Sequence, residues 1–244
     1  ALRSFLNCFT SIITFQLLDF VITELEKKVF DIELLQTGEP NTLLNAPLSD
    51  KGFIEFLLNN DIEPTYGWLN ELVGCMLNND NVGAVGAKLI FPYYEDMKNQ
   101  GKSFTIQHAG VKFREERTPY VYGPYHENMF STLIFSSDSN HQREVISNTA
   151  ACLLVPKSLY MELDGLDEAY FYGYEDIDFA FKLYQNNFNS IFNPFALLFH
   201  HESATRVEDK AEKNRLNYEN IMYFYNKWGD FIFKEMLKDK INQN

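Results

Sequence analysis

The sequence of 244 residues contains few cysteines, and those present form no obvious pair. Cys8, Cys75 and Cys152 are far apart, and no CxxC motif occurs. Disulfide frameworks and thiolate metal sites need closely spaced or paired cysteines. We therefore expect a reduced, cytoplasmic protein in which the cysteines serve as small core residues.

Basic charge is also scarce, because 21 Lys and Arg stand against 34 Asp and Glu, which gives a formal net charge of −13. A nucleic-acid binder needs a basic footprint to neutralise phosphates. None is visible, so a nucleic-acid partner is not expected. An anionic ligand would need a bound cation or a helix N-terminus to offset the negative field.

Long uninterrupted apolar runs are missing as well. The most apolar early stretch, residues 5–28, is broken by Asn7, Ser11, Gln16, Asp19 and Thr23. A membrane span needs about 20 mostly apolar residues, and a signal peptide has a basic start and a small-residue cleavage site. The stretch therefore predicts a core-packed helix and no transmembrane segment. Peripheral contact with the cytoplasmic membrane face stays open as an alternative.

What is present is an alternation of strand-like and helix-like segments, in a chain with 45% hydrophobic and 23% charged residues. This composition is typical of globular proteins. The predicted strands are 29–36, 52–58, 81–91, 103–113, 144–156 and 189–201, the last broken at Pro194. The predicted helices are 64–80, 157–165, 175–187 and 213–229. Small residues in 81–91 indicate close packing on a neighbouring helix. The alternation predicts an α/β layered fold with a mostly parallel central sheet flanked by helices.

Polar residues follow one of the predicted strands in "LLNNDIEP", where Asn59, Asn60 and Asp61 come directly after an apolar run. Open α/β sheets bind ligands at the carboxyl ends of their strands. Asp61 can supply a carboxylate oxygen to a hard cation such as Mg²⁺ or Mn²⁺. The alternative is a strand-to-helix turn in which these side chains cap the helix that begins at Pro64.

A second acidic cluster opens the predicted helix in "GYEDIDFAF". Glu175 and Asp176 fall in the first turn, where the helix dipole favours anions. They either complement that dipole, or one of them is a general base that faces a hydroxyl substrate. Asp178 points about 200° round the helix from Asp176, so the two do not easily share a site.

Two adjacent histidines end the last predicted strand, in "LLFHHES". His200 and His201 point to opposite faces, so at most one reaches a given site. Such a histidine is either a packed, hydrogen-bonded residue or, near carboxylates, a metal ligand. His108 and His126 are weaker candidates, for which surface or core roles are expected.

The order of these motifs resembles glycosyltransferase family 2, with the GT-A fold, and especially its rhamnosyltransferase-like branch. The resemblance runs through "FLLNNDIEPTYGWLNELV", "NVGAVGAKLIFP", "IQHAGVKF", "NTAACLLVPKSLYMELDGLDEAYFYGYEDIDFAFKLYQNNF" and "LLFHHESATR". It covers roughly residues 52–206, which implies a GT-A domain over 1–206 and a helical extension over 207–244.

The resemblance implies a cation site for Mn²⁺ or Mg²⁺. The "NND" tripeptide occupies the place of the family's DxD motif, with Asn59 in place of its first acid and Asn60 in the middle. Asp61 would bind the cation that bridges the diphosphate of the donor. His200 would be the further protein ligand of that cation.

The resemblance also implies an acceptor side. Asp176 would be the catalytic base, with Glu175 beside it. Thr149 and Ala150 would line the acceptor side, and Tyr174 would contact substrate from the loop that presents the base. The implied activity is inverting transfer from a nucleotide-sugar donor to a hydroxyl of a glycan or lipid-linked acceptor, in one displacement.

The first fifty residues depart from the family pattern, because neither its acidic nucleoside-binding segment nor the following Gly- and Asn-rich turn is clear. Two alternatives to the transferase are considered, the first of them because of this departure. One is a degenerate GT-A domain that binds glycan or protein without catalysis. The other is a metal-dependent phosphohydrolase, which would need more carboxylates around two metals than the sequence offers.

The C-terminal segment predicts one amphipathic helix over 213–229. Leu216, Ile221, Phe224 and Trp228 fall near one face, and Gly229 suits a helix end. We expect this helix to pack on the transferase domain, with formation of a homodimer or contact with a neighbouring domain as alternatives.

Overall fold

The computed structural model describes residues 32–37, 54–59, 61–93, 103–115, 122–132, 134–171, 173–201 and 210–242. The helix expected within residues 5–28, the thiol of Cys8 and the site residue Asn60 lie outside these ranges.

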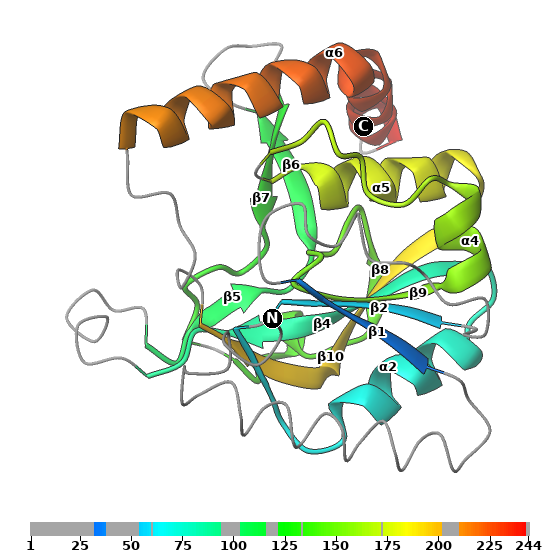
Figure 1. Ribbon diagram of the computed structural model, residues 1–244, viewed down its shortest axis with the longest axis vertical. Coiled ribbons are helices and arrows are strands. Elements are labelled where there is room, and N and C mark those ends of the chain that lie inside the picture. The colour runs from blue at the N-terminus through cyan, green and yellow to red at the C-terminus, as the bar shows by residue number, and fades with distance from the viewer. Residues whose placement is uncertain are drawn as a thin grey trace, which may run out of the picture.

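An eight-stranded sheet forms the centre of the fold (Figure 1). Its strand order is β1-β2-β9-β4-β10-β3, with β5 paired to β4 and β8 paired to β10. The strands are β1 (Ile32–Thr37), β2 (Ile54–Asn59), β3 (Ile62–Pro64), β4 (Val82–Ile90), β5 (Ile106–His108), β8 (Arg143–Val145), β9 (Cys152–Pro156) and β10 (Asn189–His200). A separate antiparallel pair is formed by β6 (Val111–Glu115) and β7 (Tyr122–His126).

The central sheet is mixed, so the expectation of a mostly parallel sheet is wrong. Within the described strands, β1–β2 and β4–β10 are parallel pairs. The pairs β2–β9, β4–β9, β4–β5, β3–β10 and β8–β10 are antiparallel. A strand buried on both faces has the same apolar run in either direction. The alternation of segments therefore indicated the α/β class without fixing the strand directions.

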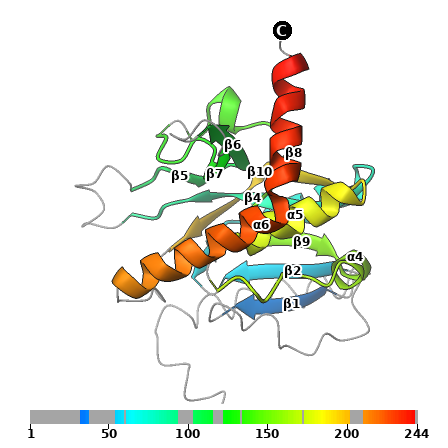
Figure 2. The same cartoon turned by 90° about the horizontal axis from the view of Figure 1, so that it is seen from above.

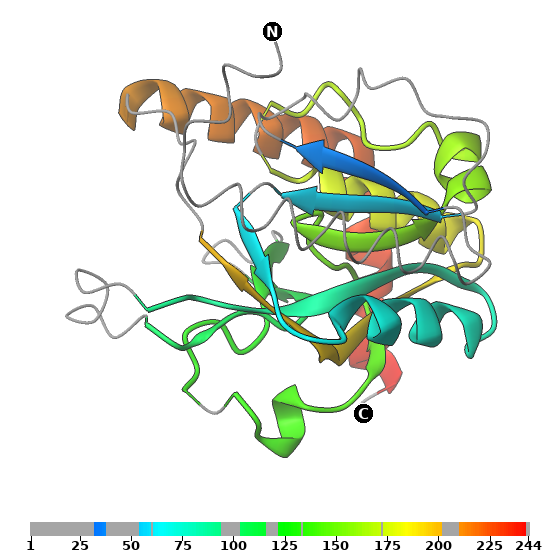
Figure 3. The same cartoon turned by 60° about the horizontal axis from the view of Figure 1, so that its bottom comes forward.

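Helices cover both faces of the sheet (Figures 1 and 3). Helix α2 (Trp68–Leu77) lies on one face, and α4 (Lys157–Glu162) and α5 (Glu175–Gln185) lie on the other. The long helix α6 (Lys210–Asn242) crosses α5, and a short 3₁₀ turn, η3, spans Ser137–Ser139. Within the described residues, no helix combines the length and the apolar character needed to cross a membrane.

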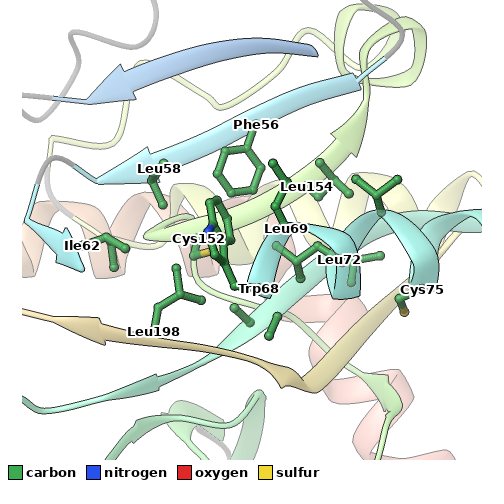
Figure 4. Packing of buried hydrophobic residues seen from close by; sticks show 14 of the residues in the cluster. Phe56, Leu58, Ile62, Trp68, Leu69, Leu72, Cys75, Cys152, Leu154 and Leu198 are labelled. Atoms are coloured by element: carbon green, nitrogen blue, oxygen red, sulfur yellow. The ribbon is translucent and has the colours of Figure 1, made fainter. Parts of the chain in front are cut away.

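The core between α2 and the sheet follows from helical spacing. Trp68, Leu69 and Leu72 of α2 are buried against the apolar side chains of β2 and β9 (Figure 4). The rings of Trp68 and Phe56 lie 5.0 Å apart between centroids. The helix begins at Trp68 and not at Pro64, because Pro64 ends the edge strand β3, where a missing N–H is tolerated.

Two further segment predictions need correction. The single strand expected over 144–156 is divided into β8 and β9, which pair with different strands. The break expected at Pro194 is a shift of register between Asn193 and Leu197 within one strand, β10. A bulge of this kind accommodates proline without ending the strand.

Helix α6 continues past Gly229, so the predicted helix end is wrong. A glycine inside a helix costs only about 1 kcal/mol, and Ile232 beyond it is buried, which stabilises the next turns. The expected packing face is confirmed at Leu216, Phe224 and Trp228, while Ile221 is half-buried. Figure 2 shows that the axis of α6 changes direction between its orange and red parts.

Replacement of Leu72 by alanine tests the core under α2. Leu72 is fully buried, so Leu72→Ala should lower the free energy of unfolding by about 2–5 kcal/mol. Leu77→Ala is the matched control on the same helix, because Leu77 is 59% exposed and should change stability by less than about 0.5 kcal/mol. Urea titration followed by circular dichroism measures both. Equal effects at the two positions would contradict this description of the core.

Candidate active site

The pairing of β3 with the end of β10 brings Asp61 and His200 together. His200 is the register partner of Ile62, and the His201 N–H donates to the carbonyl of Asp61 over 2.9 Å. As a result, Asp61 Oδ1 lies 3.1 Å from His200 Nε2. His201 instead contacts Glu63, at 3.1 Å from Nε2 to Oε2. The adjacent histidines therefore have different partners, as expected at a strand end.

The hydrogen bonds of His200 fix which ring nitrogen faces the carboxylate. His200 Nδ1 lies 2.7 Å from the carbonyl oxygen Oε1 of Gln107 in β5, so Nδ1 carries the hydrogen. In neutral His200 the Nε2 lone pair then accepts from Asn59 Nδ2 at 3.3 Å and also faces Asp61 Oδ1. Two acceptors that face each other at 3.1 Å require a proton or a cation between them.

The carboxylate of Asp61 fits the role of a cation ligand. Burial would raise its pKa, but the contact and charge of His200 outweigh that effect and hold the pKa below its ordinary value. Its Oδ1 is buried and lacks a hydrogen bond of regular geometry despite the contact with His200. Within the described residues no group of three or more His, Cys, Asp or Glu gathers to hold a metal. Asp61 and His200 are therefore the two side chains of this cluster that could hold a cation.

The second acidic cluster lies at the N-terminus of α5. Asp176 Oδ1 accepts the N–H of Ile177 at 2.8 Å, and Oδ2 accepts the N–H of Ala150 at 3.3 Å. The side chain of Thr149 also hydrogen-bonds this carboxylate. Burial raises the pKa of Asp176, although His126 and these hydrogen bonds oppose the shift.

Glu175 stands beside this carboxylate in the same turn. Burial, and then the charge of Asp176, raise the pKa of Glu175 to about 8. Its Oε2 is buried without a hydrogen bond. Two neighbouring carboxyl groups with raised pKa values do not both ionise easily at neutral pH. Catalytic acids and bases are commonly found in environments of this kind.

The segment immediately before β9 joins the two clusters. Ala150 donates its N–H to Asp176, and the carbonyl of the next residue, Ala151, accepts the N–H of Asn59 at 3.0 Å. Asn59 in turn contacts His200. Residues 149–151 therefore connect the carboxylate at the N-terminus of α5 to the polar group at the ends of β2 and β10.

A histidine pair lies beside this connection. His108 Nε2 accepts from the N–H of Gly110 at 3.2 Å and of Thr149 at 3.4 Å. The same nitrogen lies 3.5 Å from Asn148 Oδ1, and the Nδ1 atoms of His108 and His126 form a hydrogen bond of 2.7 Å. Burial lowers the pKa of both rings, and His126 also responds to the charges of Asp176 and His200. His126 thus lies within electrostatic range of both clusters.

The sequence predicted surface or core roles for this pair, and in the structure His108 is buried and His126 is half-buried. The missing information was the contact between His108 and His126, which lie on different strands separated by 18 residues. The motif "IQHAG" was a usable signal, because its histidine ends a short strand one residue after Gln107, the partner of His200.

Tyr174, the residue before α5, and Asp178 in its first turn contact α6. The ring of Tyr174, for which substrate contact was expected, packs on Phe224 with 4.9 Å between centroids. Asp178 is fully buried and accepts from Trp228 Nε1 at 2.7 Å. Asp176 and Asp178 therefore have different surroundings, as their angular separation on the helix predicted.

No family model matches the chain. The chain is 30% identical over 211 residues to uncharacterized protein y4gI of Sinorhizobium fredii, which covers 84% of this chain and 22% of that protein. It is 32% identical over 162 residues to the O-antigen biosynthesis protein RfbC of Myxococcus xanthus, covering 65% of this chain and 12% of RfbC. Over 76 residues it is 29% identical to N-acetylglucosaminyl-diphospho-decaprenol L-rhamnosyltransferase of Mycobacterium tuberculosis, covering 31% of this chain and 25% of that enzyme.

The chain therefore spans a quarter or less of the length of each of these relatives. Among solved structures, GalNAc-T7 with UDP, GalNAc and Mn²⁺ aligns with 62% of this chain and 28% of its own chain, at 12% identity and a TM-score of 0.42. A TM-score below 0.5 does not establish a common fold. The two named sequence relatives confirm the resemblance seen in the motifs: the chain is similar to glycosyltransferases of the family 2-like, rhamnosyltransferase-like branch.

Proposed function

We propose that this chain is an inverting GT-A glycosyltransferase that uses a nucleotide-sugar donor and a divalent cation, Mn²⁺ or Mg²⁺. The observation that carries the proposal is the connection of Asp61 and His200 to Asp176 through the backbone of residues 149–151. It supports a single site with a cation side and a base side. The named relatives act in O-antigen biosynthesis and on a diphospho-decaprenol, which supports a glycan or lipid-linked hydroxyl acceptor. A lipid-linked acceptor would bring the domain to the membrane face.

Asp61 Oδ1 and His200 Nε2 are the atoms that would hold the cation. When bound, a divalent cation supplies Lewis-acid neutralisation of the charge on the departing nucleoside diphosphate. In a chain with a net charge of −13, an anionic donor needs such a local positive charge to bind. The side-chain oxygen Oε1 of Gln107 accepts the hydrogen on Nδ1 of His200, so that Nε2 presents its lone pair.

Asp176 is the base of the proposed reaction. The acceptor hydroxyl oxygen attacks the anomeric carbon, the bond from that carbon to the diphosphate oxygen breaks, and the hydroxyl proton passes to the Asp176 carboxylate. One displacement of this kind inverts the anomeric centre. The N–H groups of Ala150 and Ile177 orient the carboxylate, and the burial that raises its pKa makes it a stronger proton acceptor.

The alternative is a binding domain without catalysis, which the unclear nucleoside-binding segment of the first fifty residues favours. The placement of Asp61, His200 and Asp176 supports the enzyme over that alternative. We keep the division into a transferase domain over 1–206 and a helical extension over 207–244 as part of the proposal, with self-association or contact to another domain through α6 as further possibilities for this extension.

Removal of the base tests the proposal. Asp176→Asn should keep the fold and donor binding, because the change is nearly isosteric, and should lower kcat by about 10²- to 10⁴-fold. Glu175→Gln should cost less. Asp164→Asn is the matched control, because Asp164 is exposed in a turn before α5 and an asparagine accepts its positive φ of 56°. Initial rates with a panel of nucleotide sugars measure transfer, and calorimetry measures donor binding.

Two outcomes of this experiment would count against the assignment. Near-normal transfer by Asp176→Asn with loss in Glu175→Gln would place the base on the other carboxylate. Donor binding without transfer in the parent chain, across all donors and acceptors tried, would favour the binding domain.

The adjacent histidines give a matched test of the cation site. His200→Asn should weaken Mn²⁺ binding by about 10- to 100-fold, because it removes the nitrogen that faces Asp61. His201→Asn should leave it unchanged, since His201 contacts Glu63 on the other side of the strand. Isothermal titration with Mn²⁺ alone measures both variants. Equal affinities for all three proteins would exclude His200 as a ligand.

A further inference from the structure

Helix α6 contacts the loop over residues 167–174, which leads to the proposed base, Asp176. The side chain of Asn220, which is buried, makes hydrogen bonds with both ends of a short stretch of this loop. Its Oδ1 accepts the N–H of Phe171 at 3.1 Å, and its Nδ2 donates to the carbonyl of Gly173 at 3.3 Å. One side chain of α6 therefore bridges the backbone at positions four and two residues before Glu175.

Other side chains of α6 bind on either side of this bridge. Tyr223 Oη and Lys227 Nζ donate to Asp167 Oδ2 at 3.0 and 2.7 Å, at the start of the loop. Trp228 Nε1 and Lys227 Nζ lie 2.7 Å from Oδ1 of Asp178, in the first turn of α5. The contacts of α6 thus span the loop from its beginning to the helix that carries the base, and Figures 1 and 2 show α6 passing over α5.

The backbone of the loop is strained at Tyr174, the residue after the Gly173 carbonyl that Asn220 binds. Gly173 and Tyr174 both have positive φ values, of 84° and 78°. The left-handed region is unfavourable for a residue with a side chain, and it persists only where the surroundings determine it. No side-chain hydrogen bond caps α5 at Tyr174. Asn220 on the Gly173 carbonyl and Phe224 against the Tyr174 ring are contacts that can hold this conformation.

We propose that α6 positions the catalytic base, with Asn220 as the positioning residue. This inference rests on the proposed function, in which Asp176 accepts the proton. The backbone at Gly173 and Tyr174 sets the direction in which α5 begins, and Asp176 lies in its first turn. A displacement of about 1 Å between a base and its substrate can cost about 10²-fold in rate. If α6 no longer held the loop, the rate of sugar transfer would therefore fall, and the cation site at Asp61 and His200 would not change.

Asn220→Ala is the main test, with Tyr184→Phe as the matched control. Tyr184 Oη donates to Glu235 Oε2 at 3.2 Å, so Tyr184→Phe removes a hydrogen bond between α5 and α6 far along α5 from the base. We expect Asn220→Ala to lower kcat by about 10- to 100-fold and to leave the donor KM within about twofold, because the donor binds at the cation side. Tyr184→Phe should change neither.

Hydrogen exchange gives a second readout that does not need activity. In Asn220→Ala, deuterium uptake should rise in the peptide that covers residues 168–178 and stay unchanged in the peptides of β4 and β9. Asn220→Asp keeps an oxygen for the Phe171 N–H but loses the donor to Gly173, so its uptake and kcat should be intermediate.

The outcomes separate the positioning role from the proposed function. Unchanged uptake in the loop of Asn220→Ala or Asn220→Asp would overturn the positioning role. An equal loss of kcat in Tyr184→Phe, with raised uptake across the whole domain, would also overturn it and indicate general stabilisation. If the parent chain transfers no sugar, the proposed function fails, and uptake in the loop still decides whether Asn220 holds it.

Discussion

The close approach of Asn148 to strand β4 is the contact on which the rest of the site depends. A Cβ added at Gly86 would lie 2.2 Å from the side chain of Asn148, so any larger residue would displace it. From this position Asn148 Nδ2 donates to Ser190 Oγ and to the Ile191 carbonyl of β10, each at 3.0 Å. Asn148 is thereby fixed over two central strands, one residue before Thr149. The segment that binds Asp176, His108 and Asn59 starts from this fixed point.

A second glycine of β4 allows a close approach of α5 to the sheet. A Cβ added at Gly83 would come within 2.7 Å of Leu183 in α5. Glycine at this position lets α5 pack close to the sheet, and the depth of α5 decides how near its first turn comes to the start of β9. All nine residues of β4 are buried, so neither contact can be relieved by a shift toward solvent.

Burial of the polar groups of the site is unfavourable in free energy. Hydrogen bonds from neighbouring groups offset part of this unfavourable term. Backbone N–H groups of Ala150 and Ile177 stabilise the Asp176 carboxylate, and the Gln107 carbonyl orients His200. Two other carboxylate oxygens, Asp61 Oδ1 and Glu175 Oε2, are buried without a regular hydrogen bond. Buried acceptors without a regular partner are unfavourable unless a proton or a cation binds there. The arrangement is therefore better suited to a ligand-binding site than to a structural network.

The sequence by itself determined the positions of the chemically important groups within their segments. Asp61 after an apolar strand, Asp176 in a first helical turn and His200 at a strand end follow from local patterns of burial and helix periodicity. The tertiary structure alone decided the strand directions, the hydrogen bond between His108 and His126, and the contacts of α6 with the loop before α5. A local pattern specifies which face of an element is buried. The pairing of residues far apart in the chain depends on how several elements pack at once, and the spacing of residues in the sequence does not record it.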